Sequence, residues 1–299
     1  MNVLVSGSSG LIGSALVPAL SADGHAVRRL RRAPGAGADA TSWNPDDGTF
    51  AAGALDGLDA VVHLAGENIA GGRWTASRKS RIRDSRVEGT RRLCAALAAL
   101  ETPPRVLVAA SAIGFYGDRG DALLDESAAP GIGFLPEVSR SWEAAAAAAR
   151  EAGIRVVHLR IGIVLSPAGG ALGQMLLPFK LGVGGVLGSG EQYMSWIALD
   201  DLVGIVRHAL ADESLSGPVN AVAPRAVTNR EFTRTLGQVL RRPTILPAPA
   251  FALRIALGEM ADALLLASTR VDPAALRGGS FEFLHPELDG ALRQVLDRA

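Results

Sequence analysis

Short apolar runs alternate with longer amphipathic stretches through the first half of the chain. The apolar runs are bounded like strands, and they cover residues 2–7, 25–30, 59–66, 105–114 and 154–165. Helical patterns lie between them, over residues 11–22, 77–100 and 141–153. Nearly continuous apolar strands that alternate with helices are typical of a parallel sheet covered on both faces. We therefore predict an α/β fold built on a doubly wound parallel sheet.

The pattern changes after Ser166. Residues 166–200 are rich in glycine, so we expect them to form a loop on the substrate side of the sheet. A helical pattern returns at 198–210, where Asp200 or Asp201 is the expected N-cap.

The rest of the chain is predicted to be mostly helical. Thr228 and Glu231 have the spacing of a capping box ahead of a further helix. A proline-containing joint at 247–251 precedes an amphipathic stretch and a last helix. We therefore expect a large domain over 1–246 and a smaller, mostly helical C-terminal domain over 247–299.

Composition narrows the classes of function. The 299 residues include 30 basic and 30 acidic side chains, so no global field recruits nucleic acid or an anionic membrane. The single cysteine, Cys94, excludes an internal disulfide and fits a reducing compartment. A strand that begins at Asn2 leaves no room for a signal peptide, and no apolar run reaches the roughly 20 residues of a membrane span. These features predict a cytoplasmic protein.

The stretch "SGSSGLIG" after the first strand is the most informative motif. Glycines three residues apart let the backbone turn tightly and approach a ligand, and the helix that follows presents free N–H groups to an anion. This arrangement meets the need of a dinucleotide pyrophosphate, whereas a glycine-rich turn without a ligand is the alternative. The predicted cofactor contacts of this loop are Gly7, Ser9, Gly10, Leu11, Ile12 and Gly13.

The end of the second strand indicates which dinucleotide binds. NAD-binding proteins place an acidic residue there, but this chain has arginines, of which Arg32 and then Arg31 are the expected contacts. An arginine can hold the 2′-phosphate of NADP, so the charges favour NADP (NADPH) over NAD. A solvated basic strand end is the alternative interpretation.

Several motifs together resemble the extended and atypical short-chain dehydrogenase/reductase superfamily. "GSSGLIG", "DAVVHLAG", "SAIGFYG" and "LRIGIVLSP" occur in that family's order, and "LLPFKLGVGGVLGSGEQYMSWIALDDL" is similar to its epimerase-family subgroup. The region from 247 onward resembles an appended domain of unknown function. The resemblance implies a Rossmann-type domain that binds NADP, with further cofactor contacts at Leu64, Ala65, Gly66, Arg86 and Val164.

The catalytic machinery of that superfamily is missing. Its members use a Tyr-x-x-x-Lys pair, in which lysine lowers the pKa of tyrosine, but neither Tyr116 nor Tyr193 has a lysine four residues on. Ala112 stands where the usual Ser or Thr lies. Ser111 and Tyr116 are the remaining catalytic candidates, because they follow a strand at the end of the sheet where sites form. Packing is the alternative role for Tyr116.

Three residues are candidates for the substrate side. Glu67 follows the "LAG" loop and either faces the substrate or caps the next segment. Gln192 and Trp196 lie in a glycine-rich stretch, which is either a substrate-covering loop or a structural connection. Arg86 shares a helix face with Lys79 and Arg83, which we expect to be surface residues on a solvated basic face.

The leading hypothesis is an NADP-dependent oxidoreductase or epimerase-like protein that acts on an unidentified small molecule, without nucleic acid or membrane partners. The alternative is a non-catalytic NADP-binding sensor or regulator, which loss of the Tyr-x-x-x-Lys pair favours. A full nucleotide-sugar epimerase is the weaker third possibility. The five histidines show no metal-ligand spacing, so no metal is expected.

Overall fold

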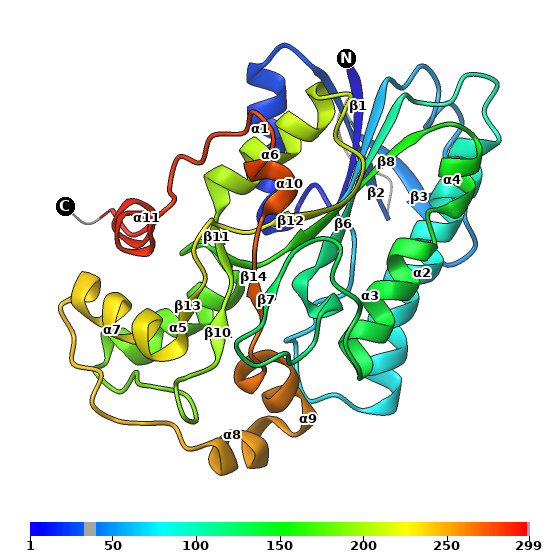
Figure 1. The fold of residues 1–299 in the computed structure, drawn as a ribbon. Coiled ribbons are helices and arrows are strands. Elements are labelled where there is room, and N and C mark those ends of the chain that lie inside the picture. Colours follow the sequence, from blue (N-terminus) through cyan, green and yellow to red (C-terminus); the bar gives the residue numbers. More distant parts are fainter. Residues whose placement is uncertain (33–39, 298–299) are drawn as a thin grey trace.

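An eight-stranded sheet forms the centre of the protein in the computed structural model, which describes residues 1–32 and 40–297 (Figure 1). All neighbouring strands are parallel except β3 and β4. In spatial order the strands are β12 (Gly217–Ala221), β8 (Arg155–Ile161), β6 (Val106–Ala112), β5 (Ala60–His63), β1 (Asn2–Ser6), β2 (Ala26–Arg31), β3 (Ala40–Asn44) and β4 (Thr49–Phe50). The predicted doubly wound sheet is thereby confirmed. Residues 33–39, which include Ala33, and residues 298–299 lie outside the described part.

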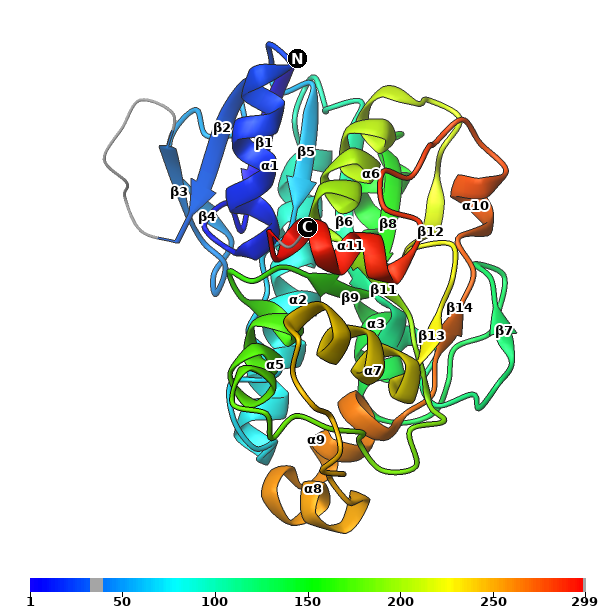
Figure 2. The ribbon, with the colours of Figure 1, turned by 90° about the vertical axis from the view of Figure 1, so that its left-hand side faces the viewer.

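Helices cover both faces of this sheet (Figures 1 and 2). α1 (Leu11–Ala22) and α6 (Leu199–Ala211) bury one face, and α2 (Ala76–Ala98) lies on the other. Side chains alternate along β1, so Val3 and Val5 join the first core whereas Leu4 joins the second. Burial on both faces explains why the strands are almost wholly apolar.

Two predicted elements are each divided in the structure. The expected helix over 141–153 is α3 (Phe134–Ala144) followed by α4 (Ala147–Glu151). α3 begins earlier than predicted because Pro136 lies in its first turn, where proline is tolerated.

The expected strand over 154–165 is β8 followed by β9 (Ile163–Leu165), with the break at Gly162. A Cβ at Gly162 would lie 2.7 Å from the Ser195 carbonyl oxygen, so only glycine allows the chain to turn there. β9 then pairs with β11 (Trp196–Ala198) outside the main sheet.

The expected loop over 166–200 contains regular structure. It holds α5 (Gly170–Lys180), β10 (Tyr193–Met194) and β11. The frequent glycines obscured the helical pattern of α5 in the sequence. In that pattern Leu172, Leu176 and Phe179 fall on one face of the helix, and they join a third core. That core also contains α7 (Asn229–Leu240), which Thr228 caps as predicted through the N–H of Glu231.

The predicted N-cap of α6 is wrong. Ala198 occupies that position, and Asp201 lies inside the helix with a buried carboxylate. The carboxylate instead accepts hydrogen bonds from the N–H groups of Leu284 (2.6 Å) and His285 (3.0 Å). Asp201 therefore anchors the segment around Leu284 and His285 to α6.

The residues after 247 are spread over the molecule (Figure 2). α10 (Ala274–Arg277) packs on β12, α11 (Leu288–Val295) packs on α7, and β14 (Arg270–Val271) pairs with β7 (Leu123–Leu124). The region after 247 also contains α8 (Ala250–Leu257), α9 (Glu259–Ala261) and a π-helical turn (Asp262–Leu266). Two further short elements, η1 (Ile113–Phe115) and β13 (Val227–Thr228), lie earlier in the chain.

Candidate functional site

The glycine loop between β1 and α1 is shaped by its own close contacts. Gly7 has φ +68°, and a Cβ there would lie 2.7 Å from the Leu64 carbonyl carbon. A Cβ at Gly13 would lie 2.3 Å from the Gly7 oxygen. Both positions thus require glycine for the loop to fold against the β5 end and against itself.

Gly10 is different, because it is exposed and has an ordinary backbone conformation (φ −76°). It is the N-cap of α1, and no side chain caps that end of the helix. The first N–H groups of a helix have no partner within it, so those of Leu11 and Ile12 are available to an anion. Ser9 is also exposed beside them.

The end of β2 carries the two predicted arginines. Arg31 is half-buried, and its Nε is buried with no hydrogen-bond partner within the described ranges. Arg32 follows it and is exposed. A buried, unpartnered donor beside an exposed guanidinium is an arrangement that a phosphate group satisfies.

Arg86 lies against the loop that follows β5. Its Nη1 donates to the carbonyls of Glu67 (2.9 Å) and Ile82 (3.2 Å), and its guanidinium stacks on Trp142 with the centroid 5.1 Å away. Burial lowers the pKa of Arg86 to about 10, and the Glu67 charge opposes that shift. A Cβ at Gly66 would lie 3.3 Å from this guanidinium, so the loop residues Leu64, Ala65 and Gly66 and Arg86 form one unit.

Val164 joins this site through the start of α5. A Cβ placed at Gly170 would lie 3.8 Å from the Val164 carbonyl oxygen and 3.1 Å from Cδ2 of Leu11. The predicted cofactor residues of β1, β5 and β9 therefore gather at the carboxyl ends of the strands, where ligands bind in such sheets.

Tyr116 does not have the geometry of a proton donor to a substrate. Its side chain is fully buried, and its hydroxyl donates to Asn220 Oδ1 (2.7 Å) and lies 3.0 Å from the Asp125 carbonyl. The same hydroxyl accepts from Arg160 at 2.9 Å. Burial raises the pKa of Tyr116, and Arg160 opposes that shift. The structure therefore favours the packing role that the sequence left open.

Ser111 is also engaged inside the protein. Its hydroxyl donates to Glu143 Oε1 at 2.7 Å, and Glu143 holds Arg160 through two hydrogen bonds of 2.9 Å each. The Arg160 side chain is only 4% exposed and that of Glu143 is 14% exposed. These side chains and Tyr116 form one network, which we call the buried ion-pair network.

Two of the three predicted substrate contacts lie in the interior. Trp196 is 1% exposed and its Nε1 donates to the Arg225 carbonyl at 3.1 Å. Gln192 donates through Nε2 to the carbonyls of Leu187 and Leu265, each at 3.0 Å. Both side chains hold the connection between α5 and α6 in place. Gln192 is only 6% exposed and Trp196 only 1%, so their burial weighs against the substrate role expected of them and favours the structural connection that the sequence left open.

Glu67 remains at the surface of the cofactor loop. Its backbone N–H donates to Ser85 Oγ and its carbonyl accepts from Arg86, so the main chain is anchored on α2. Its side chain is 31% exposed, and the nearest cation is Arg78, whose Nη1 lies 3.5 Å from Oε1. Glu67 is thus a fixed but accessible carboxylate at the carboxyl end of the sheet.

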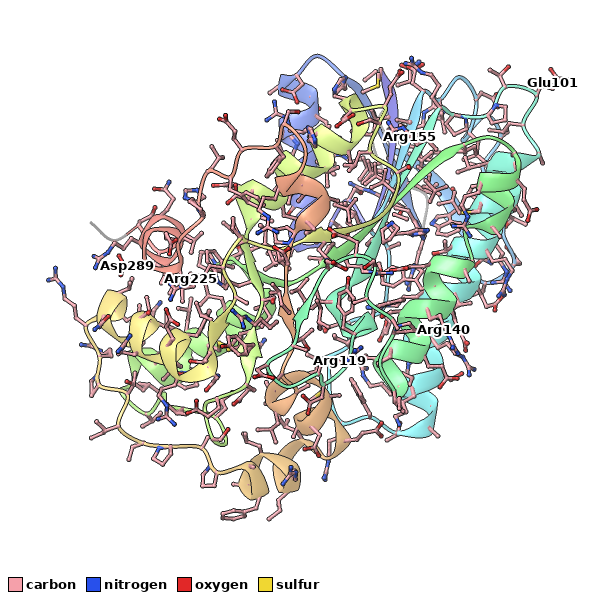
Figure 3. All side chains as sticks on the ribbon, in the orientation of Figure 1. Glu101, Arg119, Arg140, Arg155, Arg225 and Asp289 are labelled. Carbon is pink, nitrogen blue, oxygen red and sulfur yellow. The ribbon has the colours of Figure 1, made fainter. Side chains whose placement is uncertain are left out.

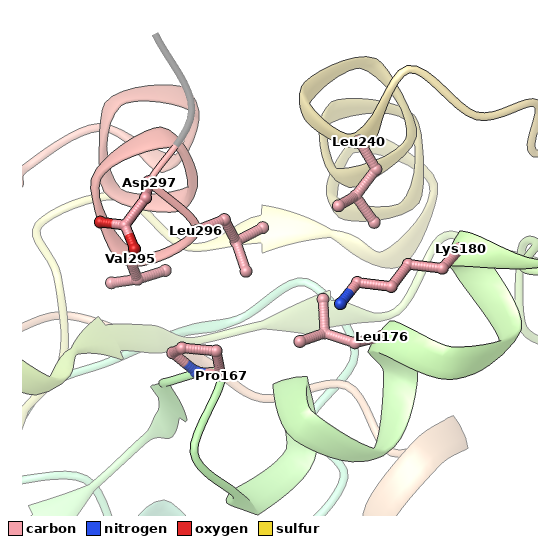
Figure 4. A pocket seen from close by; sticks show the side chains of 7 residues that line it. All are labelled: Pro167, Leu176, Lys180, Leu240, Val295, Leu296 and Asp297. Atoms are coloured by element: carbon pink, nitrogen blue, oxygen red, sulfur yellow. The ribbon is translucent and has the colours of Figure 1, made fainter.

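A hollow elsewhere contains none of the predicted site residues (Figure 4). It lies between α5, α7 and α11, and it is lined by Pro167, Leu176, Lys180, Leu240, Val295, Leu296 and Asp297. Over the described ranges, no group of three His, Cys, Asp or Glu side chains could hold a metal ion. His63 and His158 lie in core strands, where burial lowers the pKa of each to about 4.

Sequence reasoning missed Glu143, Arg160 and Asn220. A detectable signal was Arg160 itself, because a charged residue within the apolar run "VVHLRIG" requires a buried partner. The partner could not be chosen from the sequence, since Glu143 lies 17 residues before Arg160, and Asn220, which joins through Tyr116, lies 60 residues after it.

The sheet and its glycine loop define a Rossmann-type protein, the class whose members bind dinucleotides at this edge of the sheet. Residues 3–221 match the model of the NAD dependent epimerase/dehydratase family, and residues 248–295 match a domain of unknown function, DUF1731. The chain belongs to the NAD dependent epimerase/dehydratase family. The family resemblance predicted from the motifs is thereby confirmed.

Relatives match over nearly the whole chain. An epimerase family protein of Mycobacterium bovis is 47% identical over 297 residues, which cover 99% of this chain and 98% of the relative. The human epimerase family protein SDR39U1, solved with NADPH, has a TM-score of 0.92 at 36% identity and 99% coverage of both chains. A nucleoside-diphosphate sugar epimerase of Corynebacterium glutamicum has a TM-score of 0.82 at 38% identity, covering 99% of this chain and 58% of that one.

Proposed function

We propose that this protein binds NADPH at the glycine loop and transfers hydride between it and a small molecule. Two observations carry the proposal: the N-terminus of α1 has no side-chain cap, and on the neighbouring strand β2 the buried Nε of Arg31 has no hydrogen-bond partner among the described residues. The first offers N–H groups to a pyrophosphate, and the second offers a donor to a 2′-phosphate. The human relative that was solved with NADPH supports the choice of cofactor.

Each part of the proposed site has a separate task. Gly7 and Gly13 shape the loop, and Gly10 leaves room for the pyrophosphate. Arg31 and Arg32 hold the 2′-phosphate. When bound, the dihydronicotinamide supplies hydride, and the chain must then provide or remove a proton at the substrate.

Glu67 is the residue that we propose for the proton transfer or for orienting the substrate. Its main chain is fixed by Ser85 and Arg86, whereas its carboxylate is accessible. Glu143 is unsuited to this task, because Arg160 and Ser111 occupy its oxygens. A positioned, accessible carboxylate is a competent acid or base only if the substrate reaches it within hydrogen-bond distance.

A second candidate function is a non-catalytic NADPH sensor or regulator. The observation that favours it is the engagement of Tyr116 and Ser111 inside the buried ion-pair network. A protein that only binds the cofactor needs no proton donor at the nicotinamide. We expect tight NADPH binding under both proposals, and turnover distinguishes them.

A cytoplasmic location is part of the same proposal. No helix within the described ranges is long and apolar enough to cross a membrane.

Arg32→Ala is expected to weaken NADPH binding roughly tenfold to a hundredfold, since a hydrogen bond to a charged group contributes about 1.5–3 kcal/mol. NADH has no 2′-phosphate, so its affinity should change little. Calorimetry with both cofactors measures the two effects. Arg140→Ala is the matched control, because Arg140 is an exposed arginine on α3 (Figure 3). Equal affinities of the unaltered protein for NADPH and NADH would contradict the assignment of the arginines.

Glu67→Gln is expected to lower any NADPH oxidation found in a carbonyl and nucleotide-sugar screen by about 10²–10⁴-fold, the usual effect of removing a positioned acid or base. Glu101→Gln is the control, because Glu101 is exposed at the opposite edge of the sheet (Figure 3). NADPH affinity should be unchanged in both variants. Full activity of Glu67→Gln would dismiss Glu67, and no turnover with any substrate would favour the sensor.

A further inference from the structure

Exposed apolar side chains are concentrated on two segments of the chain, 177–190 and 241–258. Ten large apolar side chains of the described residues are exposed, and seven of them lie here, each between 52% and 81% exposed. They are Leu177, Leu181 and Val183 on the first segment, and Ile245, Leu246, Phe251 and Ile255 on the second. We call these seven residues the apolar patch.

The two segments lie side by side. The Ala248 N–H donates to the Val186 carbonyl at 2.8 Å, and the Gly188 N–H donates to the Ala248 carbonyl at 2.9 Å. Arg242 Nε also donates to the Lys180 carbonyl at 2.9 Å. Figure 1 shows the second segment leaving α7 and running to α8 at the lower end of the molecule. The two segments are therefore neighbours in space, although they come from distant parts of the sequence, and the apolar patch spans both.

The charge of these segments differs from that of the whole chain. Segments 177–190 and 241–258 contain no acidic residue, but they contain Lys180, Arg241, Arg242 and Arg254. Arg254 pairs with Asp262, whereas no carboxylate among the described residues pairs with the other three cations. The zero net charge of the chain thus conceals an excess of positive charge on these two segments, which acts over roughly 10 Å at about 0.1 M salt.

We propose that the apolar patch docks this protein on the surface of an anionic lipid membrane. Phe251 and Ile255 are four residues apart on α8, so they project from the same face of the helix. Apolar side chains that enter the headgroup region and cations that meet anionic lipids are the two attractions that hold interfacial proteins. This proposal revises the expectation, drawn from the net charge, that no membrane is involved.

Other occupants fit these observations less well. A two-fold contact between copies of the chain places the same surface on both sides, so Arg241 and Arg242 would face a surface of like charge. A folded protein partner must offer a matching pocket for each protruding apolar side chain, whereas a bilayer surface accepts them without a matching shape. Ile245 is 81% exposed and Ile255 is 72% exposed, so both protrude.

Vesicle co-sedimentation of the full chain tests the proposal. The protein should bind phosphatidylcholine vesicles that contain about a third phosphatidylglycerol, and binding should weaken without the anionic lipid or at high salt. The double variant Phe251→Ser, Ile255→Ser should bind at least about tenfold more weakly, because two apolar side chains no longer insert. Arg241→Asn should bind about fivefold more weakly, and asparagine tolerates the left-handed backbone (φ 54°) there.

Matched controls lie outside the apolar patch. Ile132→Ser removes an apolar side chain that is 100% exposed, and Arg140→Gln removes an exposed cation, so both should bind like the unaltered protein. Thermal unfolding of each variant checks that the fold persists. Absence of binding to anionic vesicles, or equal losses in the controls, would overturn the proposal. A dimer that the patch variants dissociate, without vesicle binding, would assign the surface to a second copy. Patch-sensitive binding of polyglutamate alone would assign it to an acidic protein.

Discussion

Gly10→Val is expected to lower the affinity for NADPH by roughly 100-fold or more while the protein stays folded. A valine side chain would occupy the space that the pyrophosphate needs in front of the α1 N–H groups, and each charge-assisted hydrogen bond lost costs about 1.5–3 kcal/mol. The fold should survive, because Gly10 is exposed with φ −76° and a Cβ there meets only the Gly7 oxygen, at 3.3 Å. Calorimetric titration with NADPH gives the affinity.

Two other glycine variants sharpen that result. Gly290→Val places the same side chain at a position with no atom within 4 Å, so NADPH affinity should not change. Gly13→Ala should disrupt the loop, because its Cβ would lie 2.3 Å from the Gly7 oxygen. If Gly10→Val bound NADPH as tightly as the unaltered protein, the glycine loop would be only a turn.

Glu143→Gln is expected to lower the free energy of unfolding by about 3–5 kcal/mol, the usual cost of removing one partner of a buried ion pair. The Arg160 charge would remain buried beside Tyr116 without its carboxylate. Urea denaturation at neutral pH measures the change.

Glu137→Gln on the same helix is the control for that variant. Glu137 is exposed in the first turn of α3, where its interaction with the helix dipole is worth about 1 kcal/mol or less. An unchanged free energy of unfolding in Glu143→Gln would show that the ion pair contributes no net stability.

Local patterns predicted the N-terminal half of the fold well. Helix α1 has the predicted bounds, Leu11–Ala22, because a glycine-rich start and an apolar periodicity agree there. Thr228 caps α7 as its spacing indicated. α5 was missed because glycine frequency suggested a loop, whereas the buried face of Leu172, Leu176 and Phe179 decided the structure.

The candidate site was predictable only where function depends on the backbone. The loop residues gather as the motif indicated, since glycine spacing reports a backbone path. Residue type alone suggested site roles for Tyr116, Gln192 and Trp196. Their burial depends on partners far along the chain. Asn220, for example, meets Tyr116 across 104 residues of sequence. No local pattern carries such a contact.

The return of the C-terminal residues to the main body has a consequence for how the protein is made. β14 pairs with β7, which lies 147 residues earlier. Leu276 completes a core that begins with β1, and Leu288 and Leu292 complete a core formed by residues between Leu165 and Leu240. Contacts so distant in sequence form slowly, and these residues leave the ribosome well after the elements on which they pack. A nascent chain therefore exposes unfinished cores until these residues have emerged, and products that stall or end before them should depend on chaperones more than the full chain does.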